Sequence, residues 1–217
     1  ILSNSETTEP LALVDPLFGL AKSADNWRAA KRHFDEALEI IAQSDQQKFL
    51  ADSRLEAARI LTQRFGFDRS ALIKAKKYLA QTEHYYQENV ARNTVEHINL
   101  NFYQAVTKAR LNSNNDAVAH LTAIVDLFDE TLDFDHPVEL KAHSMLVELY
   151  ERKGERDSAT EHCLAIAKMR PWHDSQEQTP LYRTHPEFPI SAAKRGSEGH
   201  VILELIIDDA GFVEQAQ

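Results

Sequence analysis

The sequence predicts a mostly α-helical protein, in which antiparallel helix hairpins form a superhelix of about seven helices and a short, incomplete α+β segment follows. Two observations lead to this prediction. Between Asp25 and Arg170, apolar residues recur at the spacing of one helix face. After Pro171 this periodicity ends, and apolar residues alternate or run together from Val201 to Ile207.

Helical periodicity is clearest in two segments, which share the apolar positions i, i+3, i+7, i+10, i+11 and i+14. In the first segment these positions are Trp27, Ala30, Phe34, Ala37, Leu38 and Ile41. In the second segment they are Val95, Ile98, Phe102, Ala105, Val106 and Ala109. Each stripe predicts a helix with one face in a hydrophobic core.

Residues typical of helix ends separate the predicted helices. Asp25, Asp45 and Asp68 are placed as N-caps, and Asn93 or Thr94 and Asn115 or Asp116 could cap two more helices. Gly66 and Gly154 can adopt the left-handed conformation that ends a helix. The seven predicted helices begin near Asp25, Asp45, Asp68, Asn93, Asn115, His136 and Glu155. Short connections between them favour antiparallel hairpins.

The last two predicted helices carry a spaced set of large, aromatic, small and turn-forming residues: Leu146, Tyr150, Gly154, Ala159, Cys163, Ile166 and Pro171. Gly154 permits a tight turn, Ala159 is small where two helices approach, and Pro171 stops the second helix. This set resembles a tetratricopeptide (TPR) repeat, although Val147 stands where that motif normally has a small residue. Earlier helix pairs are spaced by more than the ~34 residues of a TPR, so we predict a TPR-like domain, with an irregular helical bundle as the alternative.

Stacked hairpins of this kind imply a concave surface lined by the first helix of each pair, suited to an extended peptide or a partner helix. In the last hairpin, Lys141, Ser144 and Glu148 are the predicted binding residues of that surface. Some TPR proteins hold a peptide carboxylate there with Lys and Asn residues. Glu148 has the wrong charge for that role, so a ligand of that type is disfavoured.

The C-terminal segment predicts an extended entry, a short helix from Ile190 to Lys194, and a β-hairpin with its turn at Asp208–Gly211. The positions that define the pattern are Pro186, Phe188, Pro189, Gly196, Glu198, Gly199, Val201, Leu203 and Gly211. This pattern resembles the first half of the TonB C-terminal domain. A generic module of one helix and one hairpin is the alternative.

The resemblance covers only the last sixth of the chain, and the family domain continues into a second helix and a further strand. We therefore predict a TPR-like helical domain at residues 10–172, a linker at 173–180, and a partial TonB-like domain at 181–217. Because the chain begins with Ile1, we expect a fragment or a processed product from which a signal peptide or anchor has been removed.

Composition argues against several classes of function. With 34 acidic and 24 basic residues the formal charge is −10, which disfavours nucleic acid as a partner. Lys74, Lys76 and Lys77 form the one basic cluster, which we interpret as a solvated helix face. The single cysteine, Cys163, allows no disulfide within the chain, and the ten histidines show no metal-binding spacing. We therefore expect no enzyme activity, cofactor or metal.

The resemblance to TonB implies a function in the Gram-negative envelope. The sequence-based hypothesis is a non-enzymatic periplasmic scaffold of a TonB-type energy-transduction and outer-membrane transport system. Its partners would be a TonB-dependent receptor, a TonB complex or another envelope protein, and it would meet the membrane only through partners or a missing N-terminal segment. The alternative hypothesis is a helical-repeat assembly or regulatory protein of the envelope with no transport role.

Overall fold

The structure is a computed structural model that describes residues 10–131, 136–169, 189–198, 204–207 and 213–216. The chain divides into two units, Ile1–Ala142 and His143–Gln217. Within the described residues, no helix is both long enough and apolar enough to cross a membrane.

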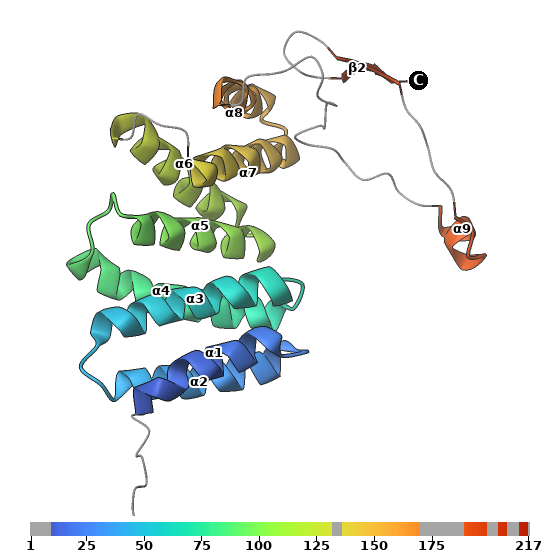
Figure 1. The fold of residues 1–217 in the computed structure, drawn as a ribbon. Coiled ribbons are helices and arrows are strands. Elements are labelled where there is room, and N and C mark those ends of the chain that lie inside the picture. The colour runs from blue at the N-terminus through green and yellow to red at the C-terminus, as the bar shows by residue number, and fades with distance from the viewer. Residues whose placement is uncertain (1–9, 132–135, 170–188, 199–203, 208–212, 217) are drawn as a thin grey trace, which may run out of the picture. The chain divides into compact units, whose positions relative to one another are not determined.

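Helices that follow one another in sequence pair as antiparallel hairpins in the first unit. Its elements are the 3-10 helix η1 (Pro10–Leu13) and the helices α1 (Val14–Ser23), α2 (Trp27–Ala42), α3 (Gln47–Phe65), α4 (Arg69–Asn89), α5 (Val95–Arg110) and α6 (Asn114–Thr131). The hairpins are α1–α2, α3–α4 and α5–α6, and they stack in chain order (Figure 1). Each second helix packs on the first helix of the next hairpin, and α3 also contacts α5 directly.

The core of this stack combines large side chains with alanines at the close approaches. The rings of Phe18 and Phe34 meet edge to face with their centroids 5.2 Å apart. Alanines with no exposed surface let neighbouring helices approach closely, and they are Ala21, Ala30, Ala37, Ala57, Ala58 and Ala75. Full burial of a side chain such as Phe34 or Leu61 stabilises the fold by about 1.5–3 kcal/mol.

The structure contains one helix in the repeat region that the sequence prediction of about seven helices missed. The described residues form α1 to α8 there, because Val14–Ser23 folds as α1 and pairs with α2. Pro16 and Gly19 make this segment look unfavourable for a helix. Pro16 is the third residue of α1, where its missing N–H removes no intrahelical hydrogen bond. The additional helix makes every hairpin of the stack complete.

Two of the predicted N-caps are confirmed and three are wrong, including that of α6, which begins at Asn114 and therefore contains both Asn115 and Asp116. The Asp68 carboxylate accepts hydrogen bonds from Ser70 N (2.8 Å) and Ala71 N (3.2 Å), and Thr94 accepts one from His97 N. Helix α2 is instead capped by Asn26, one residue after Asp25, because the Asn26 side chain accepts from Ala29 N. Helix α3 begins after Gln46 rather than Asp45, without a side-chain cap.

Gly66 does not adopt the left-handed conformation predicted for it. Its φ is −67°, which any residue can adopt. The reason for glycine at this position is steric. A Cβ at position 66 would collide with the Thr62 carbonyl and the Arg110 guanidinium. The prediction for Gly154 is confirmed, since its φ is +77° at the end of α7.

The second unit contains the remaining described elements. Helix α7 (Pro137–Lys153) continues into it and is followed by α8 (Arg156–Met169), α9 (Ile190–Lys194), β1 (Leu205–Ile207) and β2 (Val213–Ala216). The strands pair antiparallel with Ile206 opposite Gln215, and the register shifts between Ile206 and Ile207. Gly196 ends α9 with a φ of +62°. The predicted linker at residues 173–180 lies outside the described residues.

A carboxylate on α2 links the second helices of two successive hairpins. Asp35 accepts a hydrogen bond from Tyr78 Oη at 2.6 Å and pairs with Lys74 Nζ at 2.8 Å, both on α4, and it also pairs with Lys31 on its own helix. Burial opposes ionisation of Asp35, but the hydrogen bonds from Lys31, Lys74 and Tyr78 outweigh it and lower the pKa of this carboxyl from 3.8 to about 2.

The first prediction concerns the closest approach in the α7–α8 hairpin. Ala159 has no exposed surface, so replacing it with Phe should overpack the hairpin and lower stability by about 1–3 kcal/mol. Thermal unfolding measures this loss. Leu164→Phe on the same helix is the control, because Leu164 is 52% exposed and the larger ring can remain in solvent. An unchanged melting temperature for Ala159→Phe would show that the predicted repeat register is wrong.

The second prediction concerns acid stability. Because the folded-state pKa of Asp35 is depressed, its contribution is present above 3.8 and is lost as the pH falls through about 2. Asp35→Asn should therefore be less stable than the native chain at neutral pH, and the difference should shrink across this acid range. Urea unfolding at several pH values measures the difference. Glu36→Gln, at an exposed position of the same helix, is the control and should give a smaller change in stability. Equal behaviour of the two variants contradicts the prediction.

Candidate functional site

The predicted binding residues Lys141, Ser144 and Glu148 all lie on α7. Lys141 is exposed, whereas Ser144 and Glu148 are half-buried. Glu148 forms an ion pair with Arg152 Nη2 at 2.5 Å, one helical turn further along. Their role in ligand binding stays a prediction.

The residues predicted to form the repeat motif lie mostly inside the α7–α8 hairpin. Leu146, Ala159 and Ile166 are buried, and Tyr150 and Cys163 are half-buried. Burial raises the pKa of the Cys163 thiol, which reduces its reactivity at neutral pH. Pro171 lies outside the described residues.

Two histidines help to join α7 to α8, which the sequence pattern did not indicate. The Nδ1 atoms of His143 and His162 are 3.0 Å apart, and the Tyr150 ring stacks on His162 at 5.6 Å with 14° between the planes. His143 is only 4% exposed, so it is a core residue rather than a surface histidine. In the described part of the chain, no three His, Cys, Asp or Glu side chains are grouped so as to hold a metal ion.

The first helices of the hairpins carry a continuous polar stripe. On α3 it consists of Lys48, Asp52, Glu56, Arg59 and Gln63, which recur every three or four residues and so share one face of the helix. All five side chains are exposed or half-buried, while the rest of α3 is mostly buried. The stripe is therefore the part of α3 that remains accessible after the hairpins have stacked.

Side chains from α1 and α5 extend this stripe across three helices. Lys22 Nζ on α1 lies 3.2 Å from Glu56 Oε1. Arg59 donates to both oxygens of Glu56 at 2.6 and 2.7 Å, and to Gln63 Oε1 at 2.8 Å. Gln63 Nε2 then donates to Tyr103 Oη on α5 at 3.1 Å. We call the stripe with Lys22 and Tyr103 the first-helix surface.

Electrostatics within the first-helix surface fix the charge states of its members. Burial disfavours the Glu56 carboxylate, but hydrogen bonds and charge from Arg59 and Lys22 outweigh this and lower the pKa of Glu56. Burial raises the pKa of Tyr103. Neither group therefore exchanges a proton readily near neutral pH. The surface offers fixed hydrogen-bond donors, acceptors and charges instead.

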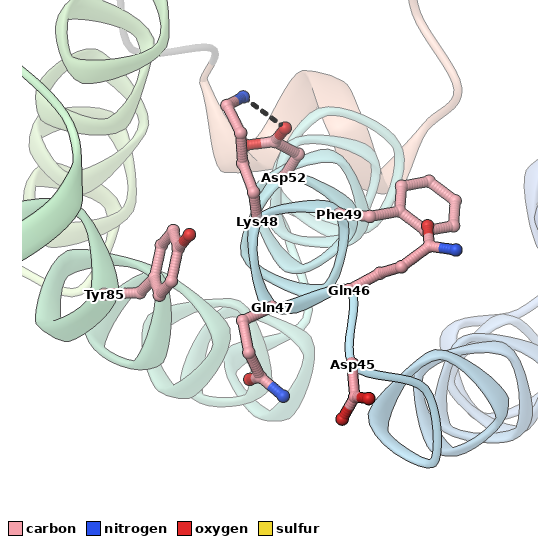
Figure 2. Close-up of a pocket in the computed structure, with 7 residues that line it drawn as sticks. All are labelled: Asp45, Gln46, Gln47, Lys48, Phe49, Asp52 and Tyr85. Atoms are coloured by element: carbon pink, nitrogen blue, oxygen red, sulfur yellow. Dashed lines mark hydrogen bonds and ion pairs between the residues drawn. The ribbon is translucent and has the colours of Figure 1, made fainter.

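The end of the stripe at Lys48 borders an open pocket of about 500 Å³. Lys48 Nζ pairs with Asp52 at 2.8 Å and with Glu96 of α5 at 3.5 Å. Tyr86 Oη of α4 donates to the other Asp52 oxygen at 2.6 Å. Figure 2 shows Tyr85 approaching from α4 on the side opposite Phe49. The pocket is lined by Asp45, Gln46, Gln47, Lys48, Phe49, Asp52 and Tyr85.

Of the TonB-like pattern, Pro189, Gly196 and Glu198 are described, and they flank α9. Pro186, Phe188, Gly199, Val201, Leu203 and Gly211 lie outside the described residues. Strand β1 begins at Leu205 and β2 at Val213. One short helix and a two-stranded pair are too general to identify a family.

Comparison with known proteins supports the helical-repeat part of this description. No family model and no curated protein matches the chain, and so nothing supports a TonB C-terminal domain. Among solved structures, the nearly identical TPR-like repeats of a kinesin light chain-like protein of Podosopora anserina match with a TM-score of 0.62 and 19% identity, covering 77% of this chain and 82% of that chain. A second crystal structure of those repeats, of a variant form, matches with a TM-score of 0.62 and 18% identity, covering 74% and 76%.

These similarities extend over most of the chain, and the TM-scores show a shared fold at low sequence identity. They agree with the hairpin stack of α1 to α6 and with the α7–α8 hairpin that the sequence motif predicts. The chain therefore has a TPR-like helical-repeat fold.

Proposed function

We propose that this chain is a non-enzymatic protein-interaction scaffold whose first-helix surface binds an extended peptide segment of a partner. The observation that carries the proposal is the row of polar side chains, joined by ion pairs and hydrogen bonds, that runs from Lys22 on α1 across α3 to Tyr103 on α5. A peptide in extended conformation presents backbone donors and acceptors in a comparable row.

The dimensions of the surface agree with a short peptide. Gln63 lies 15 residues after Lys48 on α3. The stripe between them is therefore about 22 Å long. An extended peptide of about seven residues has the same length. Arg59, Gln63 and Tyr103 could donate to or accept from its backbone, and Lys22 and Lys48 could pair with acidic side chains.

The charge states on this surface support a binding function rather than catalysis. A general acid or base works best when its pKa lies near the operating pH. The pKa of Glu56 is lowered and that of Tyr103 is raised, which moves both away from neutrality. We propose on this ground that the first-helix surface binds without performing acid–base chemistry.

The third prediction tests the binding surface. A photo-crosslinking amino acid at position 63 should give discrete adducts with a partner protein in the source cells, because Gln63 lies in the stripe between Arg59 and Tyr103. The same amino acid at position 80, at an exposed site of α4, should give none of these adducts. Gel shifts and mass spectrometry measure both.

Arg59→Ala should reduce the adduct formed at position 63, because Arg59 organises both Glu56 and Gln63. Lys77→Ala, at an exposed position of α4, is the matched control and should leave it unchanged. Circular dichroism establishes that both variants fold. The proposal fails if position 63 gives no adduct, or if positions 63 and 80 give the same ones.

The finer proposal is that this scaffold acts in the periplasm of a Gram-negative cell, as part of a TonB-type energy-transduction system. It rests on the resemblance in the sequence alone, of which Pro189, Gly196 and Glu198 are the described positions. The alternative is an envelope assembly or regulatory protein with no role in transport.

The fourth prediction separates these two proposals. The full chain, used as bait in Gram-negative envelope extracts, should recover TonB-dependent receptors or ExbB/ExbD-like proteins. A chain without residues 181–217 should lose them and should keep any partner of the first-helix surface. Quantitative mass spectrometry compares the two baits. Recovery of unrelated envelope proteins alone would favour the alternative.

A further inference from the structure

The three hairpin turns of the first unit lie together at one end of the stack. They are Ala24–Asn26, Gly66–Asp68 and Leu111–Ser113. Arg64 Nη2 donates to the Ala24 carbonyl at 3.3 Å, and Arg110 donates to the Thr62 carbonyl, so neighbouring turns are in contact. Figure 1 shows the α1–α2 and α3–α4 turns on one side of the stack and the α2–α3 and α4–α5 connections on the other. We call this group of turns the turn end.

Basic residues are concentrated at the turn end although the whole chain is acidic. Six basic and three acidic residues lie within four residues of these turns. Their net charge is +3, whereas the net charge of the whole chain is −10. The basic residues are Lys22, Arg28, Arg64, Arg69, Lys108 and Arg110. The acidic residues are Asp25, Asp68 and Asp116.

The opposite end carries the opposite charge. Within four residues of the connections at 43–46 and 90–94, the acidic residues are Glu39, Asp45, Glu88 and Glu96, and the basic residues are Lys48 and Arg92. With two basic and four acidic residues, this end has a net charge of −2. The charge of the first unit is therefore segregated along its helices.

Internal pairing occupies two of the three carboxylates at the turn end. Asp68 is committed to the first amides of α4, and Asp116 lies 3.6 Å from Lys108 Nζ. Pairing also occupies two of the cations, because Lys108 faces Asp116 and Lys22 lies 3.2 Å from Glu56. The guanidinium groups of Arg28 and Arg64 lie over the rings of Trp27 and Phe65, and both residues are exposed. Arg69 is exposed.

Helix stability explains only part of this placement of charge. Lys22, Arg64, Lys108 and Arg110 lie in the last turns of α1, α3 and α5, where the helix macrodipole favours positive charge. The other two cations do not follow this preference. The first turns of α2 and α4 contain no acidic residue and instead contain Arg28 and Arg69. The helix macrodipole makes positive charge unfavourable at an N-terminus. A pattern that opposes the local preference of two helices is expected where a surface has a role outside folding.

An exposed apolar side chain lies between two of these cations in the sequence. Phe67, in the α3–α4 turn, is fully exposed, and Ile73 in the second turn of α4 is 54% exposed. Arg64 and Arg69 flank Phe67 in sequence. Phe67 therefore adds an exposed aromatic ring to a surface that is otherwise basic.

We propose that the turn end docks on an anionic lipid surface, with its arginines on the headgroup phosphates and Phe67 inserted among the headgroups. Arginine matches phosphate in geometry and charge. Adjacent protruding turns can reach a flat surface together, whereas the open pocket at Lys48 lies at the acidic end. The two ends of the stack are about 28 Å apart, which is the length of a 19-residue helix such as α3. This distance is several times the Debye length, which is about 8 Å at physiological salt. The acidic end therefore repels the lipid surface only weakly.

The fifth prediction tests this docking with the full chain. Sedimentation should recover the chain with vesicles of equal parts phosphatidylglycerol and phosphatidylcholine, but not with vesicles of phosphatidylcholine alone. Arg64→Gln and Arg69→Gln should each weaken binding about fivefold. Phe67→Ser should also weaken it, without changing its dependence on salt.

Matched controls come from other exposed sites. Arg92→Gln removes a positive charge at the acidic end, and Phe49→Ser removes an exposed ring there. Both should leave vesicle binding unchanged. Circular dichroism establishes the fold of each variant.

Three results would overturn the proposal. Equal binding to the two kinds of vesicle would exclude recognition of anionic lipid. Equal losses for Arg69→Gln and Arg92→Gln would exclude the turn end as the contact surface. Binding of soluble polyglutamate to the native chain but not to Arg69→Gln, with no binding to either vesicle, would identify an acidic protein segment as the partner in place of lipid.

Discussion

The packing of α3 is the constraint on which the first unit depends. This helix contacts α2, α4 and α5, so most of its circumference must be apolar or small. Ala57 and Ala58 have no exposed surface, and the hydroxyl groups of Thr62 and Thr107 form a buried pair at 3.1 Å between α3 and α5. A helix surrounded in this way fixes the spacing of both neighbouring hairpins.

The polar stripe follows from the same packing. Most of α3 is buried, and the residues of its polar stripe are held in place by one another and by Lys22 and Tyr103. Half-exposed ion pairs of this kind contribute about 0–1 kcal/mol each to stability, so they set geometry more than they stabilise the fold. The buried hydrophobic contacts of the helices supply the stability. The polar residues of the first-helix surface can therefore serve binding without being needed for the fold.

Local patterns in the sequence predict the helices that have one buried face. The stripe of α2 is visible because this helix buries a single face that includes Phe34. The stripe predicted for α5 is only partly right: Ile98 and Ala105 are buried, but Val95 is 63% exposed, and the buried face includes Leu100, Gln104 and Thr107, which lie outside that stripe. Helix α3 shows no such stripe, because it is buried on several sides, and the N-cap predicted for it, Asp45, is one residue too early. Helix α1 escaped prediction because the helix-breaking tendency of Pro16 is cancelled by its place in the first turn.

The candidate site could not be found in the same way. Gln63 and Tyr103 are 40 residues apart, and no local rule connects them. Their contact depends on how two hairpins stack, which is a tertiary property. Likewise, Asp35 and Tyr78 on α2 and α4 look like ordinary surface and core residues in the sequence, and only their 2.6 Å hydrogen bond shows that they join two hairpins.

The contact between Gly66 and Arg110 limits how such a protein can change. Gly66 belongs to one hairpin and Arg110 to the next, and the Arg110 guanidinium lies in the space beside Gly66 and donates to the Thr62 carbonyl. A side chain at position 66 would displace this guanidinium and break the hydrogen bond between the hairpins. Each hairpin is thus shaped to its own neighbour rather than to a generic one. Duplication or exchange of a single hairpin would lose this contact. We therefore expect the repeats of such a protein to change together during evolution and not to be exchanged one at a time.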